Sequence, residues 1–509
     1  MRYREHLRQR YHALLGYTGF IIMLIGAFTL LPLLIIPFYP SEIRHAPGFL
    51  LAGLPFIGVG GLVWKLLTPK QAFSLTIQEG AVVMAVIWIT ACAVGSIPFM
   101  IINEMDITLA LFESTSGYTT TGLTIIDHAE TPRMLLLFRS VTHLAGGAGF
   151  AIIAVLAAST SLGMGVSAAE GRGDQLAPNV RRSATIVLSL YLGYIGFGII
   201  ALRIAGMEWF DAINHAIAAV ATGGFSTRPE SVGYWDSRLI ESVVIVLMLL
   251  GSINFVIAYT VLKGKPGVLV RSAEVRSQTF LIIASSLLIT GVTTTAIYST
   301  VADGARVALF ETISAVTSSG FTIGNSTIYG GWNDFGLLVL TLLMALGGGA
   351  GSTSGGIKQL RVYVLYKSAF WEIKRAFLPA HAVNEPVIWQ ADRHEPLSDR
   401  QVRQAAQFVG VYLTLFFIGT AIISAYGYPL SQSMFEFSSA LGNAGMSVGI
   451  TSADAPGGIL WLLMAAMMFG RLEIFVLIVG ILKLATDTRD MILPQKQIWA
   501  TPTEPSRRL

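Results

Sequence analysis

The chain has 509 residues, of which 53% are hydrophobic and 13% are charged, and its mean hydropathy is +0.64. Soluble domains carry about 25% charged residues, so this composition excludes a soluble globular protein and predicts one that crosses a membrane many times. The net charge of +4 does not indicate binding to nucleic acid, because the cationic residues fall where membrane topology would place them.

Ten apolar segments are each near the ~20 residues that a membrane-spanning helix needs. They are residues 14–38, 49–67, 77–102, 134–159, 185–204, 239–262, 280–300, 335–366, 408–425 and 459–484. With the N-terminus in the cytoplasm, most of the 34 Lys and Arg residues lie on the cytoplasmic side, as the positive-inside rule requires. The sequence therefore predicts an all-α polytopic membrane protein with both termini in the cytoplasm.

Four stretches between these spans are too polar and too short to cross a membrane, and each predicts a half-helix followed by a loop. They are ALFESTSGYTTTGLT (110–124), AINHAIAAVATGGFST (212–227), ALFETISAVTSSGFTI (308–323) and SMFEFSSALGNAGMSV (433–448). Each contains a glycine in the same register, namely Gly122, Gly224, Gly320 and Gly445. Internal repetition of this kind predicts four span–pore-helix–span repeats around a pseudo-fourfold pore, plus an N-terminal two-helix hairpin.

The repeats divide the chain into seven predicted segments. These are the N-terminal hairpin (1–70), repeat 1 (71–165), repeat 2 (166–265), repeat 3 with a broken helix (266–370), a cytoplasmic linker (371–401), repeat 4 (402–490) and a cytoplasmic tail (491–509).

The repeated glycines suggest a filter for cations. A cation that enters hydrocarbon loses hydration worth tens of kcal/mol, and backbone carbonyl oxygens can replace that water without a fixed charge. Glycine adopts the backbone angles that aim successive carbonyls at one axis, and the C-terminal end of a half-helix is partly negative. The alternative is that these glycines serve close helix packing. Four copies in register favour the filter.

Acidic residues flank and occupy the half-helices. Asp106 and Asp303 precede half-helices one and three and are predicted N-caps. Carboxylates stand at one equivalent position in half-helices one, three and four, where the second has His215: Glu113, Glu311 and Glu436. Buried carboxylates in membrane proteins usually have partners. They either accept hydrogen bonds from filter amides or only brace the half-helix.

The eighth span contains the sequence MALGGGAGSTSGGIK (344–358) at mid-membrane depth. Such a run cannot form a regular helix in lipid, because glycine weakens helices and free backbone groups need partners. We predict a gating loop beneath the filter, formed by Gly347, Gly348, Gly349, Gly351, Ser352, Thr353, Ser354, Gly355 and Gly356. A packed glycine seam is the alternative, but it explains the three hydroxyl residues poorly.

Arg471 in the last span lies near the membrane midplane, where a charged side chain usually has a functional role. Facing the pore, it would repel a cation and belong to the gate. The alternative is a pair with Glu473 or with a buried structural partner, although residues two apart on a helix do not face each other.

The combination of these motifs is similar to the Trk/Ktr/HKT potassium transporter superfamily, and most of all to its Trk-type uptake subunits. The loop sequences TTTGL, ATGGF, TSSGF and NAGM, the segment GGGAGSTSGGIK and the motif GRLE carry the resemblance, which spans nearly the whole chain. It implies potassium uptake across a bacterial cytoplasmic (inner) membrane. It also implies a homodimer and a cytoplasmic nucleotide-binding regulatory subunit (TrkA-like).

The resemblance further assigns the filter carbonyls to three residues in each loop. These potassium-binding residues are Thr120, Thr121, Gly122, Thr222, Gly223, Gly224, Ser318, Ser319, Gly320, Asn443, Ala444 and Gly445. Potassium is then the transported ion, and no cofactor is expected in this chain.

Two other functions were weighed against this one. A secondary transporter that couples potassium to sodium or protons also uses broken helices at the midplane, but it usually shows two inverted halves. An intramembrane enzyme is suggested only by a GxGD pattern at 171–174 in a hydrophilic segment, so we do not expect an enzyme.

Overall fold

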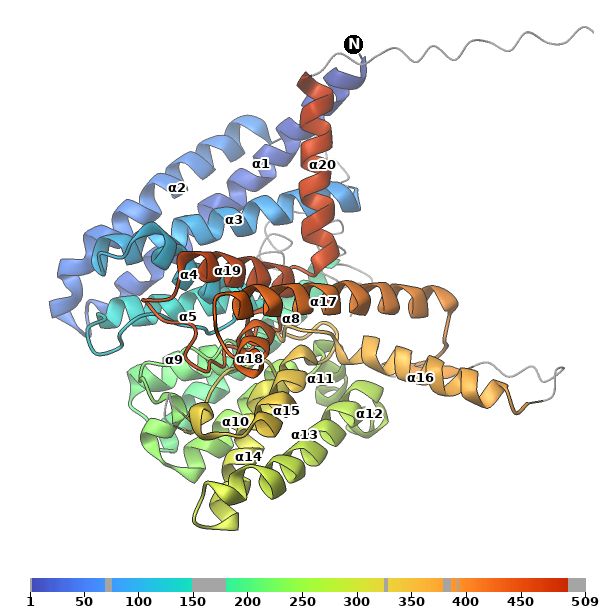
Figure 1. Cartoon of the computed structure of the whole chain (residues 1–509). Coiled ribbons are helices and arrows are strands. Elements are labelled where there is room, and N and C mark those ends of the chain that lie inside the picture. The colour runs from blue at the N-terminus through green and yellow to red at the C-terminus, as the bar shows by residue number, and fades with distance from the viewer. Residues whose placement is uncertain are drawn as a thin grey trace, which may run out of the picture.

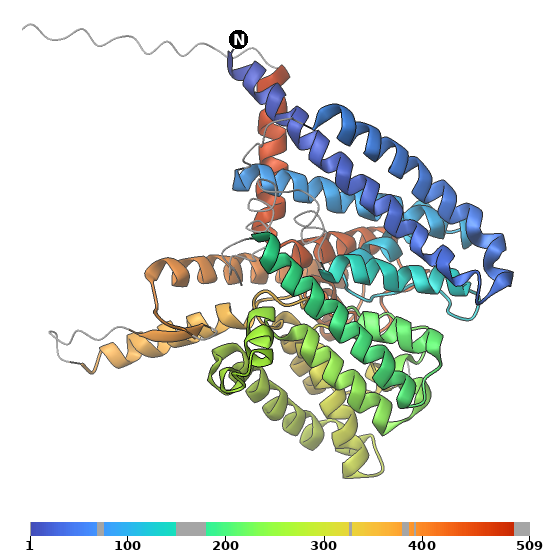
Figure 2. The same cartoon turned by 180° about the vertical axis from the view of Figure 1, so that it is seen from behind.

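The computed structural model describes residues 2–68, 76–148, 180–324, 328–378, 386–390 and 393–492. Within these ranges the chain is almost entirely helical (Figures 1 and 2), and its only strands there are β1 (Val387–Gln390) and β2 (Arg393–Pro396), paired antiparallel. The predicted boundaries near 70 and 165, the GxGD pattern and most of the predicted tail lie outside the described residues.

An N-terminal hairpin packs along the first repeat. Helices α1 (Arg2–Leu30) and α2 (Ala46–Leu67) are joined by two short 3-10 helices, η1 (Leu31–Ile35) and η2 (Pro40–His45). Their backbones approach closely at glycines, since a Cβ on Gly26 would lie 2.7 Å from the carbonyl oxygen of Gly53. In Figure 1 the hairpin forms one edge of the molecule and lies beside α3.

Each of the four repeats has a long first helix, a shorter second helix and, after a loop, a third helix. In chain order they are α3 (Ile77–Ile102), α4 (Ile107–Tyr118), α5 (Arg133–Ala148); α8 (Val180–Ile204), α9 (Trp209–Val220), α10 (Arg238–Ser252); α13 (Ala273–Val292), α14 (Val301–Val316), α15 (Asp334–Ala345); α17 (Asp399–Ala425), α18 (Leu430–Leu441), α19 (Gly457–Arg471).

Shorter elements connect or extend these helices. They are η3 (Ser231–Trp235), α11 (Phe255–Leu262), α12 (Gly267–Arg271), η4 (Thr294–Ala296), η5 (Ile328–Gly331), α16 (Gln359–Arg375) and α20 (Ile474–Ile492).

All ten predicted spans have a counterpart among the described residues. Six are long apolar helices, two are bent pairs, and two are the shorter helices α5 and α15. Two of the predicted spans, 239–262 and 459–484, are bent, because α10 meets α11 at 108° and α19 meets α20 at 103°. At the first bend Asn254 caps a new helix by accepting from the Val256 amide at 2.8 Å, and at the second Glu473 takes a left-handed φ of 55°.

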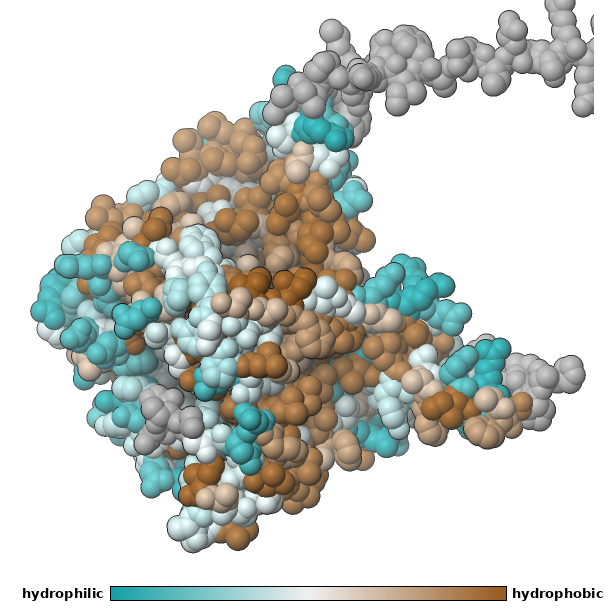
Figure 3. Space-filling model, viewed as in Figure 1, coloured by the Kyte–Doolittle hydropathy of each residue, from teal (hydrophilic) through white to brown (hydrophobic). Residues whose placement is uncertain are grey.

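The surface is that of a membrane protein. Large apolar side chains stand exposed on helices far apart in sequence, including Leu51, Phe280 and Phe417, whereas soluble monomers rarely expose contiguous apolar patches of more than a few hundred Å². Figure 3 shows hydrophobic surface across the middle of the molecule, with hydrophilic residues at its left edge and at the right, where α16 and α17 project. The protein is therefore an all-α polytopic membrane protein.

The caps of the short helices follow the sequence in one case and not in another. Asp106 caps α4, accepting from the Leu109 amide at 2.9 Å as predicted. The prediction for Asp303 is wrong, because α14 begins earlier and its N-cap is Thr300, which accepts from the Asp303 amide at 3.1 Å. The Asp303 carboxylate in turn accepts a hydrogen bond from the Thr300 hydroxyl at 2.6 Å.

Candidate functional site

The four short helices α4, α9, α14 and α18 end in the same way. We call the segments that follow them loops 1 to 4, residues 119–124, 221–226, 317–322 and 442–447. The second residue of each loop takes a left-handed φ of 52° to 55°, although none is glycine: Thr120, Thr222, Ser318 and Asn443. The next amide in each loop donates to a carbonyl five residues back at 2.8 to 2.9 Å. This is the Schellman helix ending, repeated four times.

A left-handed conformation costs a residue with a side chain about 1–2 kcal/mol. Four such residues persist at equivalent positions, so the surrounding packing must impose the turn. The turn reverses the chain directly after the partly negative end of each short helix.

The four repeated glycines form a closed ring. Their φ values lie between 71° and 95°, in the left-handed region. A Cβ on each would lie 2.1 to 2.2 Å from a carbonyl oxygen of the next repeat: Gly122 against Gly223, Gly224 against Ser319, Gly320 against Ala444, and Gly445 against Thr121. The ring glycine of each loop therefore contacts the next repeat, at the residue directly before that repeat's own ring glycine. No side chain fits at any of the four positions.

The same four glycines line one cavity of about 130 Å³, which we call the vestibule. Residues from all four loops surround it, and its wall carries both polar and apolar side chains: Thr124, His128, Arg139, Ser226, Arg228, Ser231, Thr322, Tyr329 and Ser447, with Phe225, Pro229 and Met446. The structure thus brings together, around one axis, glycines that lie up to 323 residues apart in sequence.

Fully buried acidic side chains hold three of the loops from behind. Glu113 accepts from the Ile125 amide at 3.1 Å, Glu311 from the Ile323 amide at 3.1 Å and Glu436 from the Val448 amide at 3.0 Å. Each also accepts from the hydroxyl two residues after the ring glycine of its loop: Thr124, Thr322 and Ser447, at 2.7 to 2.9 Å. Both predicted roles are combined, because each carboxylate ties its helix to the returning chain.

Repeat 2 reaches the same result with different residues. His215 replaces the carboxylate, and its Nε2 lies 2.9 Å from the Ser226 hydroxyl, while its Nδ1 lies 2.8 Å from the Asp211 carbonyl oxygen. The Asp211 carboxylate accepts from the Thr227 hydroxyl at 2.6 Å and pairs with Arg228 at 3.1 Å. The hydroxyl after each ring glycine is therefore bound in all four loops.

Sequence reasoning missed these hydroxyls, and it also missed Arg139. The pattern of glycine, apolar residue and Ser or Thr was visible in all four loops and could have identified the hydroxyls. Arg139 on α5 is 1% exposed and pairs with Glu113 at 2.8 Å. It also donates to the Thr124 hydroxyl at 2.9 Å and to the Ser226 carbonyl oxygen at 3.0 Å. A lone arginine inside an apolar span was its only signal.

The glycine-rich segment breaks the helix where predicted, between α15 and α16. Its backbone bonds partly to the end of α10, since the Gly349 amide donates to the Ser252 carbonyl oxygen at 2.9 Å. It also folds on itself, since the Gly348 amide donates to the Ser354 hydroxyl at 2.8 Å. Ser352, Thr353 and Ser354 are buried. The segment is a loop buried within protein, and its glycines also pack closely, since a Cβ on Gly355 would lie 2.4 Å from the Gly442 carbonyl oxygen.

This glycine-rich loop lies against loops 2, 3 and 4, at their left-handed residues. The Thr353 and Thr222 hydroxyls are 3.2 Å apart, and those of Ser354 and Ser318 are 2.9 Å apart. A Cβ on Gly355 would lie 2.8 Å from the side chain of Asn443. None of its residues lines the vestibule. The loop therefore contacts the ring from a side other than the vestibule.

Arg471 completes the contact with the remaining repeat. Its guanidinium donates to the carbonyl oxygen of Thr353 in the glycine-rich loop and to that of Gly146 on α5. Gly146 packs under the end of α4, because a Cβ there would lie 2.0 Å from the Tyr118 carbonyl oxygen. Glu473 pairs with Arg361 at 2.7 Å. Arg471 thus links the glycine-rich loop to repeat 1.

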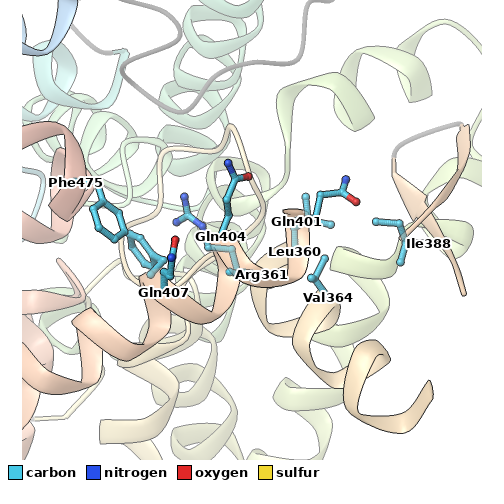
Figure 4. Close-up of a pocket in the computed structure, with 10 residues that line it drawn as sticks. Leu360, Arg361, Val364, Ile388, Gln401, Gln404, Gln407 and Phe475 are labelled. Atoms are coloured by element: carbon cyan, nitrogen blue, oxygen red, sulfur yellow. The ribbon is translucent and has the colours of Figure 1, made fainter. Parts of the chain in front are cut away.

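A second cavity, of about 470 Å³, is lined by residues of α16, β1, α17 and α20 (Figure 4). Arg361 lines it from α16, four residues after Ile357, which forms an isolated β-bridge with Leu346. Three glutamines face it from α17, and apolar side chains close it: Gln401, Gln404 and Gln407, with Leu360, Val364, Ile388 and Phe475. The Arg361 pair with Glu473 joins this cavity to the bend after Arg471.

No group of three or more His, Cys, Asp or Glu side chains that could hold a metal ion occurs in the described part of the chain. The oxygen atoms that abut the ring glycines are backbone carbonyls, and such oxygens suit a weakly held alkali cation.

Comparison with known proteins places this geometry among cation transporters. A family model described as TrkH, cation transport protein, matches residues 45–489. The Trk system potassium uptake protein TrkG of Escherichia coli (strain K12) is 32% identical over 484 residues, covering 91% of this chain and 96% of that protein. An uncharacterized cation transporter of Methanocaldococcus jannaschii is 30% identical over 475 residues, covering 92% and 94%. The crystal structure of the potassium transporter TrkH from Vibrio parahaemolyticus is similar with a TM-score of 0.78 and 26% identity, covering 92% and 98%.

Proposed function

Because this chain belongs to the TrkH family of cation transport proteins, we propose that it takes up potassium across a membrane through a pore on the axis of the four loops. The closed ring of glycines carries the proposal. Each glycine abuts a carbonyl oxygen of the next repeat, so each of the four repeats contributes a carbonyl oxygen to the ring.

In the ring, backbone carbonyl oxygens would replace the water oxygens that a cation loses when it is dehydrated. In loop 1 the backbone carbonyls of Thr120 to Gly122 would coordinate potassium. The carbonyls at the equivalent positions of loops 2 to 4 would do the same. Partly negative ends of four short helices favour a cation at this place. No acidic side chain is needed, and the three buried glutamates turn instead toward the backbone amides behind the loops.

The glycine-rich loop and Arg471 form the gate in this proposal. The loop contacts the ring from outside the vestibule, and Arg471 ties it to α5. A cation leaving the ring on that side would meet the guanidinium charge. Movement of the loop away from Arg471 would open the path.

Uptake of radioactive rubidium into liposomes that hold only this protein tests the function. We expect rubidium uptake that follows an imposed potential and that sodium inhibits poorly. Gly122→Ser should lower the preference for rubidium over sodium by about tenfold or more, because its side chain would enter the space of the Gly223 carbonyl oxygen.

Gly58→Ser is the matched control, since nothing lies within 4 Å of a Cβ there. Wild-type liposomes without rubidium uptake would exclude the function. Uptake that requires a sodium or proton gradient, whatever the potential, would favour a coupled secondary transporter.

The location and partners of the protein extend the proposal. We place it in a bacterial cytoplasmic membrane, with the vestibule outside and both termini inside. A homodimer and a cytoplasmic nucleotide-binding subunit would assemble there, the latter acting near the cavity beside α16 and α17, whose Arg361 is joined to the bend after Arg471. Native mass spectrometry should give twice the chain mass of 54.7 kDa, and a monomer alone would contradict the dimer.

A further inference from the structure

Loop 2 is held by two side chains of α5, a helix of the preceding repeat. Phe225 follows the ring glycine of loop 2 and is 2% exposed. The Arg139 guanidinium carbon lies 3.8 Å from the centre of its ring, and the His143 ring stacks on it with centroids 4.3 Å apart and planes 13° apart. Arg139 and His143 are four residues apart, so they share one face of α5.

Hydrogen bonds to the described residues do not explain why a histidine occupies position 143. Its side chain is 0% exposed, and neither ring nitrogen has a hydrogen-bond partner among the described residues. A buried polar atom without a partner costs roughly 1–3 kcal/mol, so the histidine does not serve stability through hydrogen bonding. Its contacts are with the filter loop.

The ring of His143 packs directly against Gly223. A Cβ on Gly223 would lie 2.5 Å from both Nδ1 and Cε1 of the imidazole. The other three loops carry a side chain at this position: Thr121, Ser319 and Ala444. The imidazole therefore fills space that the loop's own side chain would otherwise fill.

Loops 1 and 3 show what such a side chain does. The Thr121 hydroxyl lies 2.7 Å from that of Thr119, and the Ser319 hydroxyl lies 2.8 Å from that of Thr317. These bonds tie the residue before the ring glycine to the end of the short helix. Loop 2 has Ala221 and Gly223 at the two positions and can form no such bond.

We propose that His143 is a positioning residue for the ion filter, which by its shape sets the Gly223 carbonyl oxygen in place of the missing side chain. That oxygen is the one that abuts Gly122, so a displaced loop 2 would alter the ring at the boundary of repeats 1 and 2. The inference rests on the proposed function. It makes His143 a determinant of ion preference although it lies behind the filter and not in the pore.

Four variants in rubidium-loaded liposomes test this inference. His143→Phe keeps a flat ring and removes both nitrogens, and we expect it to preserve the rubidium-to-sodium preference within about twofold. His143→Ala should lower the preference about tenfold. Gly223→Ser should lower the rubidium-to-sodium preference, because the serine side chain clashes with the imidazole of His143. The double variant His143→Ala with Gly223→Ser should recover much of this preference, because the serine then fills the space that the imidazole occupied.

His12→Ala is the control, since His12 is exposed on α1, far in sequence from the filter. Elution as a single species and an unchanged melting temperature would show that His143→Ala still folds. The inference is overturned if His143→Phe behaves like His143→Ala, or if the double variant is no better than either single one. A wild-type protein that takes up no rubidium would instead defeat the proposed function.

Discussion

At the scale of single residues, loops 1 and 2 depend on buried charges with several partners each. Arg139 and Glu113 lie at 1% and 0% exposure, 2.8 Å apart, and between them bind both loop 1 and loop 2. Desolvation makes such a pair a weak source of stability, but removal of one partner leaves an uncompensated buried charge. The pair therefore fixes geometry more than it adds free energy.

Arg139→Leu should lower the free energy of unfolding by about 3–5 kcal/mol, because Glu113 is then left charged and buried. The double variant with Glu113→Leu should lose less than the sum of the two single losses. Chemical denaturation in detergent, followed by tryptophan fluorescence, measures these values.

Arg238→Leu provides the control, because its pair with Asp303 is exposed and 3.7 Å long. Surface pairs of this kind contribute about 0–1 kcal/mol. Equal losses for Arg139→Leu and Arg238→Leu would contradict a special role for the buried pair.

The ring glycines could be predicted from sequence because their requirement is local and repeats in register. The partners that hold the loops could not, because they come from distant segments. Arg139 reaches Ser226 in the next repeat, and His215 substitutes for a carboxylate only because Asp211 supplies the missing charge nearby. The periodicity of the sequence predicts the fold within one repeat, but it does not predict which side chains of one repeat contact the loop of another.

At the scale of elements, breaks in helices create the contacts around the ring. The third helices of repeats 2, 3 and 4 all end early, at Ser252, Ala345 and Arg471. The break at the glycine-rich loop was predictable, because glycines and hydroxyl residues weaken a helix. The two bends were not, since the apolar runs continue through them and a single residue such as Asn254 or Glu473 decides the turn.

Arg471→Ala should increase rubidium flux severalfold, because it removes the two hydrogen bonds that tie the glycine-rich loop to Gly146 and hold it beside the ring. Arg471→Lys should give an intermediate flux, since an ammonium lacks the planar fork that reaches two carbonyls. Initial rates in liposomes measure both variants. Deletion of residues 348–354 should also raise flux.

An unchanged rate for Arg471→Ala would assign the arginine a structural role only. A folded deletion variant with normal or lower flux would remove the loop from the gate. Phe417→Ala, at an exposed apolar position on α17, should leave the rate as it is in the wild type.

At the scale of the whole molecule, the protein places polar residues at its centre and apolar residues on its outside. The loops, the three glutamates and the hydroxyls of the glycine-rich loop are buried, while leucines and phenylalanines of α2, α13 and α17 are exposed. This inversion was predictable from composition and repeats. The order of the four loops around the axis was not, because no local signal encodes which repeats are neighbours.

Orientation can be tested with thiol labelling, because Cys92 is the only cysteine and is buried. A membrane-impermeant maleimide added to intact cells should label Glu130→Cys, an exposed position beyond loop 1, and not the wild type. Glu372→Cys, exposed near the end of α16, should react only after the cells are permeabilised. The reverse pattern would invert the assigned topology.

The contacts of the glycine ring all run in one rotational sense. Every ring glycine contacts a carbonyl oxygen of the repeat that follows it, and the last glycine contacts the first repeat. A substitution at one ring glycine therefore displaces the loop of the following repeat and not that of the preceding one. A bulky residue at Gly320 would strain its own left-handed backbone and would also clash with the Ala444 carbonyl oxygen in the fourth repeat. Second-site substitutions that restore the function of such a variant should therefore lie mainly in the following repeat, and not equally in the repeats on both sides.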